Sequence, residues 1–156
     1  MATFYRINIP NTLVSTPVSL LELPAPADRG FRMMRAVITP DADAASKAWV
    51  ASVCRIKGPG ITPGSGGVAA SFVKIFPASS DIAFPGGTVF NTTLISGGTL
   101  ETYGTFHFEN IVTYEAQRNG EPVIISPNDW LVIKLDTPSG GPETISGSVL
   151  VGFVGD

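Results

Sequence analysis

The residue types that most often perform catalysis are scarce in this chain of 156 residues, which has one histidine, His107, and one cysteine, Cys54. A Ser-His-acid hydrolase needs a histidine held between a nucleophile and a carboxylate. His107 lies in an alternating stretch beside Thr105 and Glu109, without the turn that presents a nucleophile in G-x-S-x-G proteins. Cys54 lies in an apolar stretch, which favours a small buried side chain over a reactive thiolate. We therefore expect no catalytic residues and no enzymatic activity.

Metal and phosphate sites are not predicted either. Asp41-Ala42-Asp43 has the D-x-D spacing of a calcium loop, but the next residues lack the further oxygen ligands and the glycine. An N-terminal helix cap is the commoner use of such aspartates. The Gly-rich stretch 58–67 follows Lys57 instead of ending in G-K-[ST], so it does not resemble a phosphate loop. We expect no cofactor and no bound metal.

Composition excludes several classes of partner. The formal net charge of -3 leaves no basic excess to neutralise a phosphate backbone, so nucleic acid is not expected. No apolar run approaches the roughly 18 residues that a membrane span needs, so no membrane is expected. The N-terminus also lacks a charged region followed by an apolar one, which predicts a product that is not exported by a signal peptide.

The elements that would position any site are strands. Apolar and polar residues alternate along the whole chain, and 17 Gly with 13 Pro separate the alternating runs. This pattern predicts a single-domain, all-β antiparallel sandwich over 1–156, with an extended N-terminal segment at about 1–17 and a mobile or extended loop at 58–67. Only 41–48 suggests a helical turn or a loop. The expected strands are 3–9, 18–23, 31–39, 48–56, 68–76, 88–95, 103–114, 122–125, 130–136 and 145–154.

Two of the expected strands, 48–56 and 68–76, are apolar on both faces. Trp49 and Val53 share one face of the first, and Cys54 lies on the other. Because an antiparallel strand in a solitary sandwich usually keeps one polar face, we expect a second subunit to cover the extra apolar face. Coverage by loops of the same chain is the alternative. The expected interface residues of these strands are Trp49, Val53, Phe72 and Phe76.

Arginines gather at 29–35. Arg29 and Arg35 share a predicted strand face with Phe31 and Met33, a mixture suited to docking on an acidic protein surface; solvated arginines are the equal alternative. Charge also differs between the two halves of the chain. Residues 1–78 hold eight Lys/Arg and four Asp/Glu (+4), and 79–156 hold two and nine (-7). This asymmetry is compatible with complementary patches between copies.

The C-terminal third carries a family resemblance. The Asn119-Gly120 pair predicts a tight hairpin, the run PVIISPNDWLVIKL follows at 122–135, and the glycine-spaced strand SGSVLVGFV follows at 146–154. This order resembles the last strands of small single jelly-roll proteins. Small jelly rolls of low charge without catalytic residues look like the cement or decoration proteins of tailed-bacteriophage capsids. The resemblance implies a β-sandwich of jelly-roll type.

The resemblance also implies a function. Such a protein would be a structural virion protein that binds the outer capsid surface and bridges major capsid protein subunits. It would be made in the host cytoplasm and act as a homo-oligomer, a trimer in preference to a dimer. Arg29 and Arg35, with the four apolar residues above, would form the oligomer or capsid interface, and 3–17 and 58–67 would reach the shell.

A different function class stays open from the sequence. A jelly roll can also be a carbohydrate-binding or receptor-binding module, such as a fibre head or a lectin. In that case exposed aromatic side chains would stack on sugars. The candidates are Trp49, Trp130, Tyr5 and Tyr103.

Overall fold

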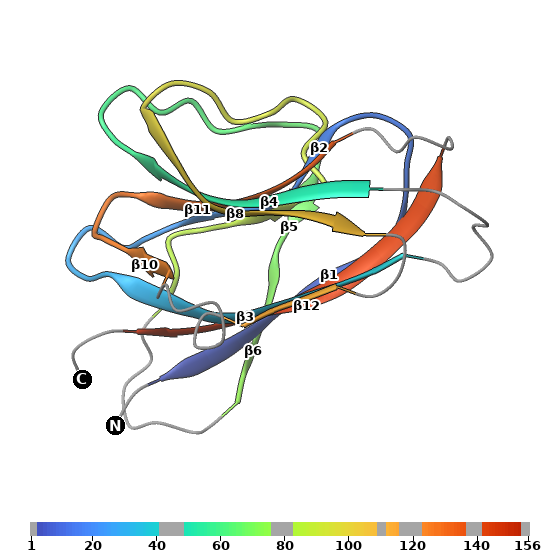
Figure 1. Ribbon diagram of the computed structural model, residues 1–156. Coiled ribbons are helices and arrows are strands. Elements are labelled where there is room, and N and C mark those ends of the chain that lie inside the picture. The colour runs from blue at the N-terminus through green and yellow to red at the C-terminus, as the bar shows by residue number, and fades with distance from the viewer. Residues whose placement is uncertain are drawn as a thin grey trace.

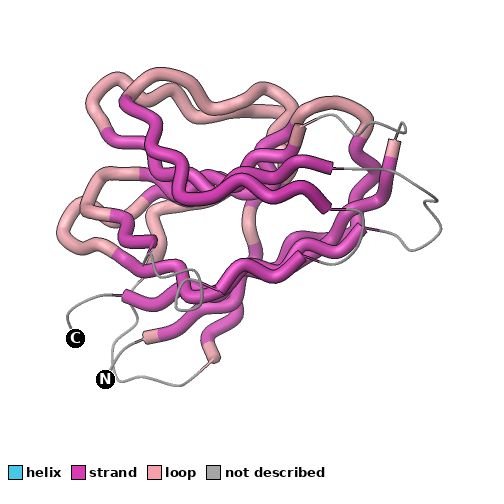
Figure 2. Tube along the Cα trace, in the orientation of Figure 1, coloured by secondary structure: helices cyan, strands magenta, loops and turns pink. Residues whose placement is uncertain are grey.

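The computed structural model describes residues 3–40, 49–75, 83–108, 112–115, 123–136 and 142–153. They form two antiparallel sheets packed face to face (Figure 1). Within these residues there is no helix (Figure 2). The predicted all-β antiparallel sandwich is confirmed, whereas its jelly-roll type stays a prediction. The strands are β1 (Phe4–Val14), β2 (Val18–Pro24), β3 (Phe31–Pro40), β4 (Trp49–Lys57), β5 (Val68–Ala69), β6 (Ser71–Lys74), β7 (Thr88–Val89), β8 (Thr99–Phe108), β9 (Val112–Glu115), β10 (Val123–Ile125), β11 (Trp130–Leu135) and β12 (Glu143–Phe153).

The two sheets draw strands from the whole chain. Sheet A has the order β10-β3-β12-β1-β6, and β9 also pairs with β3. Sheet B has the order β5-β7-β2-β11-β4-β8. β1 therefore lies between the last long strand, β12, and the short edge strand β6. The expected helical turn or loop at 41–48 and the Asn119-Gly120 hairpin lie outside the described residues.

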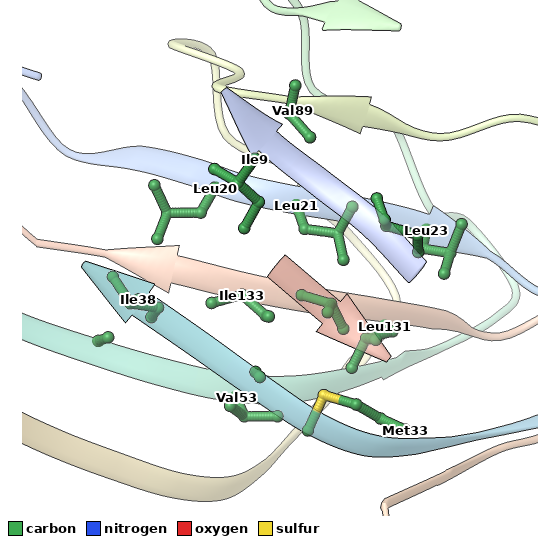
Figure 3. Packing of buried hydrophobic residues seen from close by; sticks show 14 of the residues in the cluster. Ile9, Leu20, Leu21, Leu23, Met33, Ile38, Val53, Val89, Leu131 and Ile133 are labelled. Atoms are coloured by element: carbon green, nitrogen blue, oxygen red, sulfur yellow. The ribbon is translucent and has the colours of Figure 1, made fainter. Parts of the chain in front are cut away.

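The core fills the space between the sheets. Alternate residues of each strand point inward because successive side chains of a strand face opposite sides. Figure 3 shows Leu21 and Ile133 of sheet B near Ile38 of sheet A, and all three are buried. Full burial of each such side chain contributes about 2 kcal/mol. The stretches in which apolar and polar residues alternate most regularly are therefore the strands that bury the core.

Two expected strands are each divided between the sheets. The stretch 68–76 ends its pairing in sheet B at Ala69, and resumes in sheet A at Ser71. The amide of Ala70, between them, donates to the carbonyl of Gly87 (2.9 Å). The stretch 103–114 likewise belongs to β8 in sheet B and β9 in sheet A. Alternation continues through each crossing, so the sequence pattern did not reveal it.

Two loops form a third layer over the outer face of sheet B. Residues 58–67 and 91–98, here called the loop layer, lie above this sheet on the side away from sheet A (Figure 1, green and yellow). They pair with each other through Thr62 and Ser96 (2.8 and 3.0 Å) and through Ser65 and Thr93 (3.0 Å). Gly97 has a φ of 75°, and a side chain there would collide with the backbone of the opposite loop. The predicted extended loop is thus a paired structure held against the sheet.

A buried carboxylate fastens the loop layer to sheet B. Glu22 of β2 has no exposed surface, and its two oxygens accept hydrogen bonds from the amides of Gly64 (2.9 Å) and Ile95 (3.1 Å). Each of these amides belongs to a different loop. A carboxylate that accepts two backbone hydrogen bonds is a strong anchor, because charged acceptors form stronger bonds than neutral ones. Beneath the layer, burial raises the pKa of the Cys54 thiol, although a hydrogen bond with Thr102 opposes this.

A buried ion pair fixes one end of the sandwich. Arg55 of β4 donates to Asp129 from Nε (2.8 Å) and Nη2 (2.5 Å), and Nη2 also donates to Ser126 (2.7 Å). Although burial alone lowers the pKa of Arg55, its hydrogen bonds to Asp129 and Tyr103 raise that pKa above its usual value. The 126–129 segment is a turn before Trp130, in which the amide of Asp129 donates to the carbonyl of Ser126 (3.1 Å).

Glu22→Gln should open the loop layer. Glutamine can accept one of the two amides, but its NH2 group faces the other, which costs about 1–3 kcal/mol for the unpaired donor. Because the layer covers Cys54, we expect faster reaction of this thiol with Ellman's reagent under native conditions. Glu115→Gln in sheet A is the matched control and should react like the parent protein. Equal labelling rates for both variants would show that Glu22 does not fasten the layer.

Asp129→Asn should destabilise the fold by about 3 kcal/mol, because it leaves a mostly buried guanidinium without its counter-charge. Asp28→Asn removes the carboxylate of an ion pair at 71% side-chain exposure and should change stability by less than about 1 kcal/mol. Urea unfolding measures both. If both variants lose a similarly small amount of unfolding free energy, Asp129 does not anchor this end of the sandwich.

Candidate binding surface

Two of the expected interface residues are core residues of the single chain. Trp49 and Val53 have 0% and 2% exposure and belong to the main hydrophobic cluster. Their strand β4 has sheet A against its inner face. On its outer face Cys54 and Ile56 pack with Ile95 of the loop layer. The expectation of a second subunit here is therefore corrected: loops of the same chain cover the second apolar face.

The two phenylalanines expected at an interface differ in what the structure describes. Phe72 points inward from β6 and is half-buried, stacked on Phe84 with ring centroids 5.2 Å apart. It is a peripheral core residue instead of a surface contact. Phe76 lies outside the described residues. On the opposite face of the same stretch, Val73 and Ile75 stay 38% and 40% exposed, so here the second apolar face is open.

The expected arginine pair is separated by a bulge in β3. Arg29 precedes the strand and forms an ion pair with Asp28 (3.3 Å). Val151 of β12 lies opposite Met33. Leu150, the residue before Val151, lies opposite Arg35, so no residue of β12 lies opposite Met34. Met34 is therefore an extra residue that shifts the later part of the strand by one position. As a result Arg35 faces outward, and the expectation that it shares a face with Phe31 and Met33 is wrong.

The outer face of sheet A brings three exposed arginines together across three strands. One cross-strand row runs from Arg6 of β1 through Leu150 of β12 to Arg35 of β3. The next row runs from Phe4 through Gly152 and Arg32 to Ile124 of β10. Residues opposite each other in adjacent strands share a face. We call this surface the arginine face; its side chains are Phe4, Arg6, Arg32, Arg35, Ile124 and Leu150.

Phe4 packs closely against Gly152 on the arginine face. A Cβ atom at Gly152 would lie 2.8 Å from the Phe4 ring, so the absence of a side chain lets the ring lie against the backbone of β12. An aromatic ring that covers a strand glycine in this way also shields its backbone. Arg6 and Arg35 then rise on either side of the half-buried Leu150.

Charge pairing distinguishes these arginines from several other cations. Arg29, Arg55 and Lys57 form ion pairs with Asp28, Asp129 and Glu101. In the part of the chain that the structure describes, no ion pair involves the three arginines of the arginine face. Glu115 of β9 is the one described carboxylate residue opposite any of them, and its opposite residue is Arg35. The face therefore keeps a positive excess.

Of the residues first considered for catalysis or metal binding, the structure describes the side chain of Cys54, whereas Asp41 and Asp43 lie outside the described residues. Cys54 is buried and lies 3.7 Å from the hydroxyl of Thr102. His107 belongs to β8, but its side chain is outside what is described. Among the described residues, no three His, Cys, Asp or Glu side chains are grouped as metal ligands. The same residues include no helix long and apolar enough to cross a membrane.

The remaining expectations concern segments and aromatic side chains. The N-terminal stretch expected to reach a shell is instead β1, hydrogen-bonded on both sides within sheet A. Of the four aromatics considered for sugar stacking, Trp49 is core, and Tyr5, Tyr103 and Trp130 are each partly buried against hydrophobic clusters. Trp49 is therefore excluded from sugar stacking, whereas Tyr5, Tyr103 and Trp130 keep part of their surface exposed, and the carbohydrate-binding alternative stays a prediction.

The signal for the arginine face was only partly present in the sequence. Arg32 and Arg35 belong to the cluster recognised at 29–35, but Arg6 was not included. The bulge at Met34 and the pairing of β1 with β12 bring the three together. No family model, curated protein or solved structure matches this chain. The functional proposal therefore depends on the chemistry of this surface and on the resemblance described above.

Proposed function

We propose that this protein is a structural virion protein that decorates the outer surface of a capsid and binds it through the arginine face. The observation that carries the proposal is the contrast between the two outer sheet faces. The loop layer covers sheet B, whereas on sheet A three arginines that form no ion pair with any described residue lie among half-exposed apolar side chains. Arginine with apolar side chains is the composition typical of protein interfaces.

The rigidity of the sandwich suits a protein that acts by binding alone. A decoration protein stabilises a shell when it binds the assembled lattice more tightly than the free subunits. A surface formed by hydrogen-bonded strands loses little conformational entropy when it docks, because its backbone is already ordered. The arginine face lies on β1, β3, β10 and β12, which are all paired strands of one sheet.

The strand order supports the jelly-roll part of the proposal. Jelly rolls are two-sheet sandwiches in which consecutive strands alternate between the sheets by Greek-key connections. Here β1, β2, β3 and β4 alternate between sheets A and B. The last two long strands, β11 and β12, each insert between earlier strands of the two sheets.

Self-association is part of the proposal, with a trimer preferred over a dimer. The outer face of β4 no longer supports it, because loops cover that face. Val73 of the short edge strand β6, opposite Arg6, and Ile75, just after this strand, are the exposed apolar side chains that support it. Light scattering should give the mass of an oligomer, and Val73→Ser with Ile75→Ser should shift the mass toward 16.3 kDa. A parent protein that is monomeric at high concentration would contradict this part.

Binding to capsid shells is the decisive test of the function. Shells of the virus that encodes this sequence, assembled without the protein, should co-sediment with added purified protein at a fixed stoichiometry. The decorated shells should also release their genome at a higher temperature than bare shells. Free capsid subunits serve as the control and should bind more weakly. No saturable binding to the shells would reject the proposed function.

A further inference from the structure

The arrangement of the arginine face indicates what kind of surface it binds. Arg6 and Arg35 lie in one cross-strand row, two strand spacings apart, which places their Cα atoms about 10 Å from each other. Leu150 lies between them, and Arg32 lies in the next row of the same face, opposite Gly152, two residues further along β12. The face thus presents an apolar centre with a guanidinium group on each side.

A second copy of the chain is a poor occupant of this face. Two copies related by a twofold axis would present the same face to each other, so arginines would approach arginines. Like charges brought together in an interface cost several kcal/mol. Glu115 opposite Arg35 is the one described acidic residue that could offset three guanidinium groups. Charge complementarity therefore requires a different, acidic partner.

A phosphate backbone is also a poorer match than a protein surface. Nucleic-acid sites neutralise many phosphates with an extended set of basic residues, whereas this chain has a net charge of -3 and three arginines on the face. Leu150 lies between Arg6 and Arg35, the Phe4 ring covers Gly152 beside Arg32, and Ile124 lies on the other side of Arg32. Apolar side chains at the centre of a charged surface are favoured by a partner with its own apolar group there.

We propose that the arginine face binds an acidic protein surface, on which two carboxylates meet Arg6 and Arg35 and an apolar side chain between them packs on Leu150. Guanidinium groups fit this role because they bind carboxylates through two parallel hydrogen bonds. The inference rests on the proposed function only in taking a capsid subunit as the partner in the virion. Its chemistry applies to any acidic protein.

A glutamate-tyrosine copolymer and poly-L-glutamate are suitable probes, because one offers carboxylates with apolar rings and the other carboxylates alone. We expect the copolymer to bind more tightly, and binding to weaken with salt. Arg6→Gln with Arg35→Gln should weaken copolymer binding by about ten-fold or more. Leu150→Ala should reduce the preference for the copolymer over poly-L-glutamate.

Arg29→Gln is the matched control, since it removes an equivalent charge from outside the face, and it should weaken binding less than about two-fold. Thermal unfolding of each variant confirms that it is folded. An equal effect of Arg29→Gln and either single substitution in the face would overturn the inference. Tighter binding of heparin or duplex DNA than of the copolymer would overturn it too, because the ligand would then be a sulfate or phosphate polyanion.

The shell experiment separates this inference from the proposed function. If the parent protein and the Arg6→Gln, Arg35→Gln variant bind shells equally, the inference fails and the function stands. If the parent does not bind shells but copolymer binding depends on the two arginines, the function fails and the inference stands. Loss of shell binding in the variant, with retention in Arg29→Gln, supports both.

Discussion

The carboxylate of Glu22 decides which face of the sandwich is free to bind. Sheet B is apolar on both sides, and its outer side carries Cys54, Ile56 and Val132. Glu22 holds the loop layer over this side through one amide of each loop. Without that anchor, glycine-rich loops would have to lose conformational entropy for few contacts. With the Glu22 anchor, the loop layer covers the outer face of sheet B. Among the described residues, only the outer face of sheet A has no such covering layer.

The sequence predicted the fold class and most strand positions because alternation is a local property. The strands at 18–23, 31–39 and 130–136 begin where they were expected, since each buries one face in the core. The failures are at two crossings and at 88–95, where β7 ends at Val89 and the following residues belong to the loop layer. The stretches 68–76 and 103–114 each change sheets, and a strand that changes sheets keeps its period of two. Where the chain leaves one sheet for the other is determined by pairing with distant segments, which a single stretch of sequence does not contain.

The binding surface was harder to predict because it depends on register. Both faces of β4 are apolar, which is equally compatible with a second subunit and with loops of the same chain. The hydrogen bonds from Gly64 and Ile95 to Glu22, across 42 and 73 positions, and the packing of Ile95 on Cys54 distinguish them. The bulge at Met34 is a second case. One extra residue moves Arg35 from the core side to the outside, where it joins Arg6, a residue from the first strand.

The arginines of the proposed docking surface also oppose contact between two copies of that surface, whereas Val73 and Ile75 at the edge of the same sheet carry no charge. An open apolar sheet face is an aggregation hazard, and natural proteins reduce that hazard with charged side chains. Arg6, Arg32 and Arg35 repel an identical face, while Leu150 between them keeps enough apolar area for a complementary one. Specificity then comes from the cost of wrong partners as much as from contacts with the right one. The proposed binding to a capsid requires this combination, because many copies of the arginine face would lie close together on one shell.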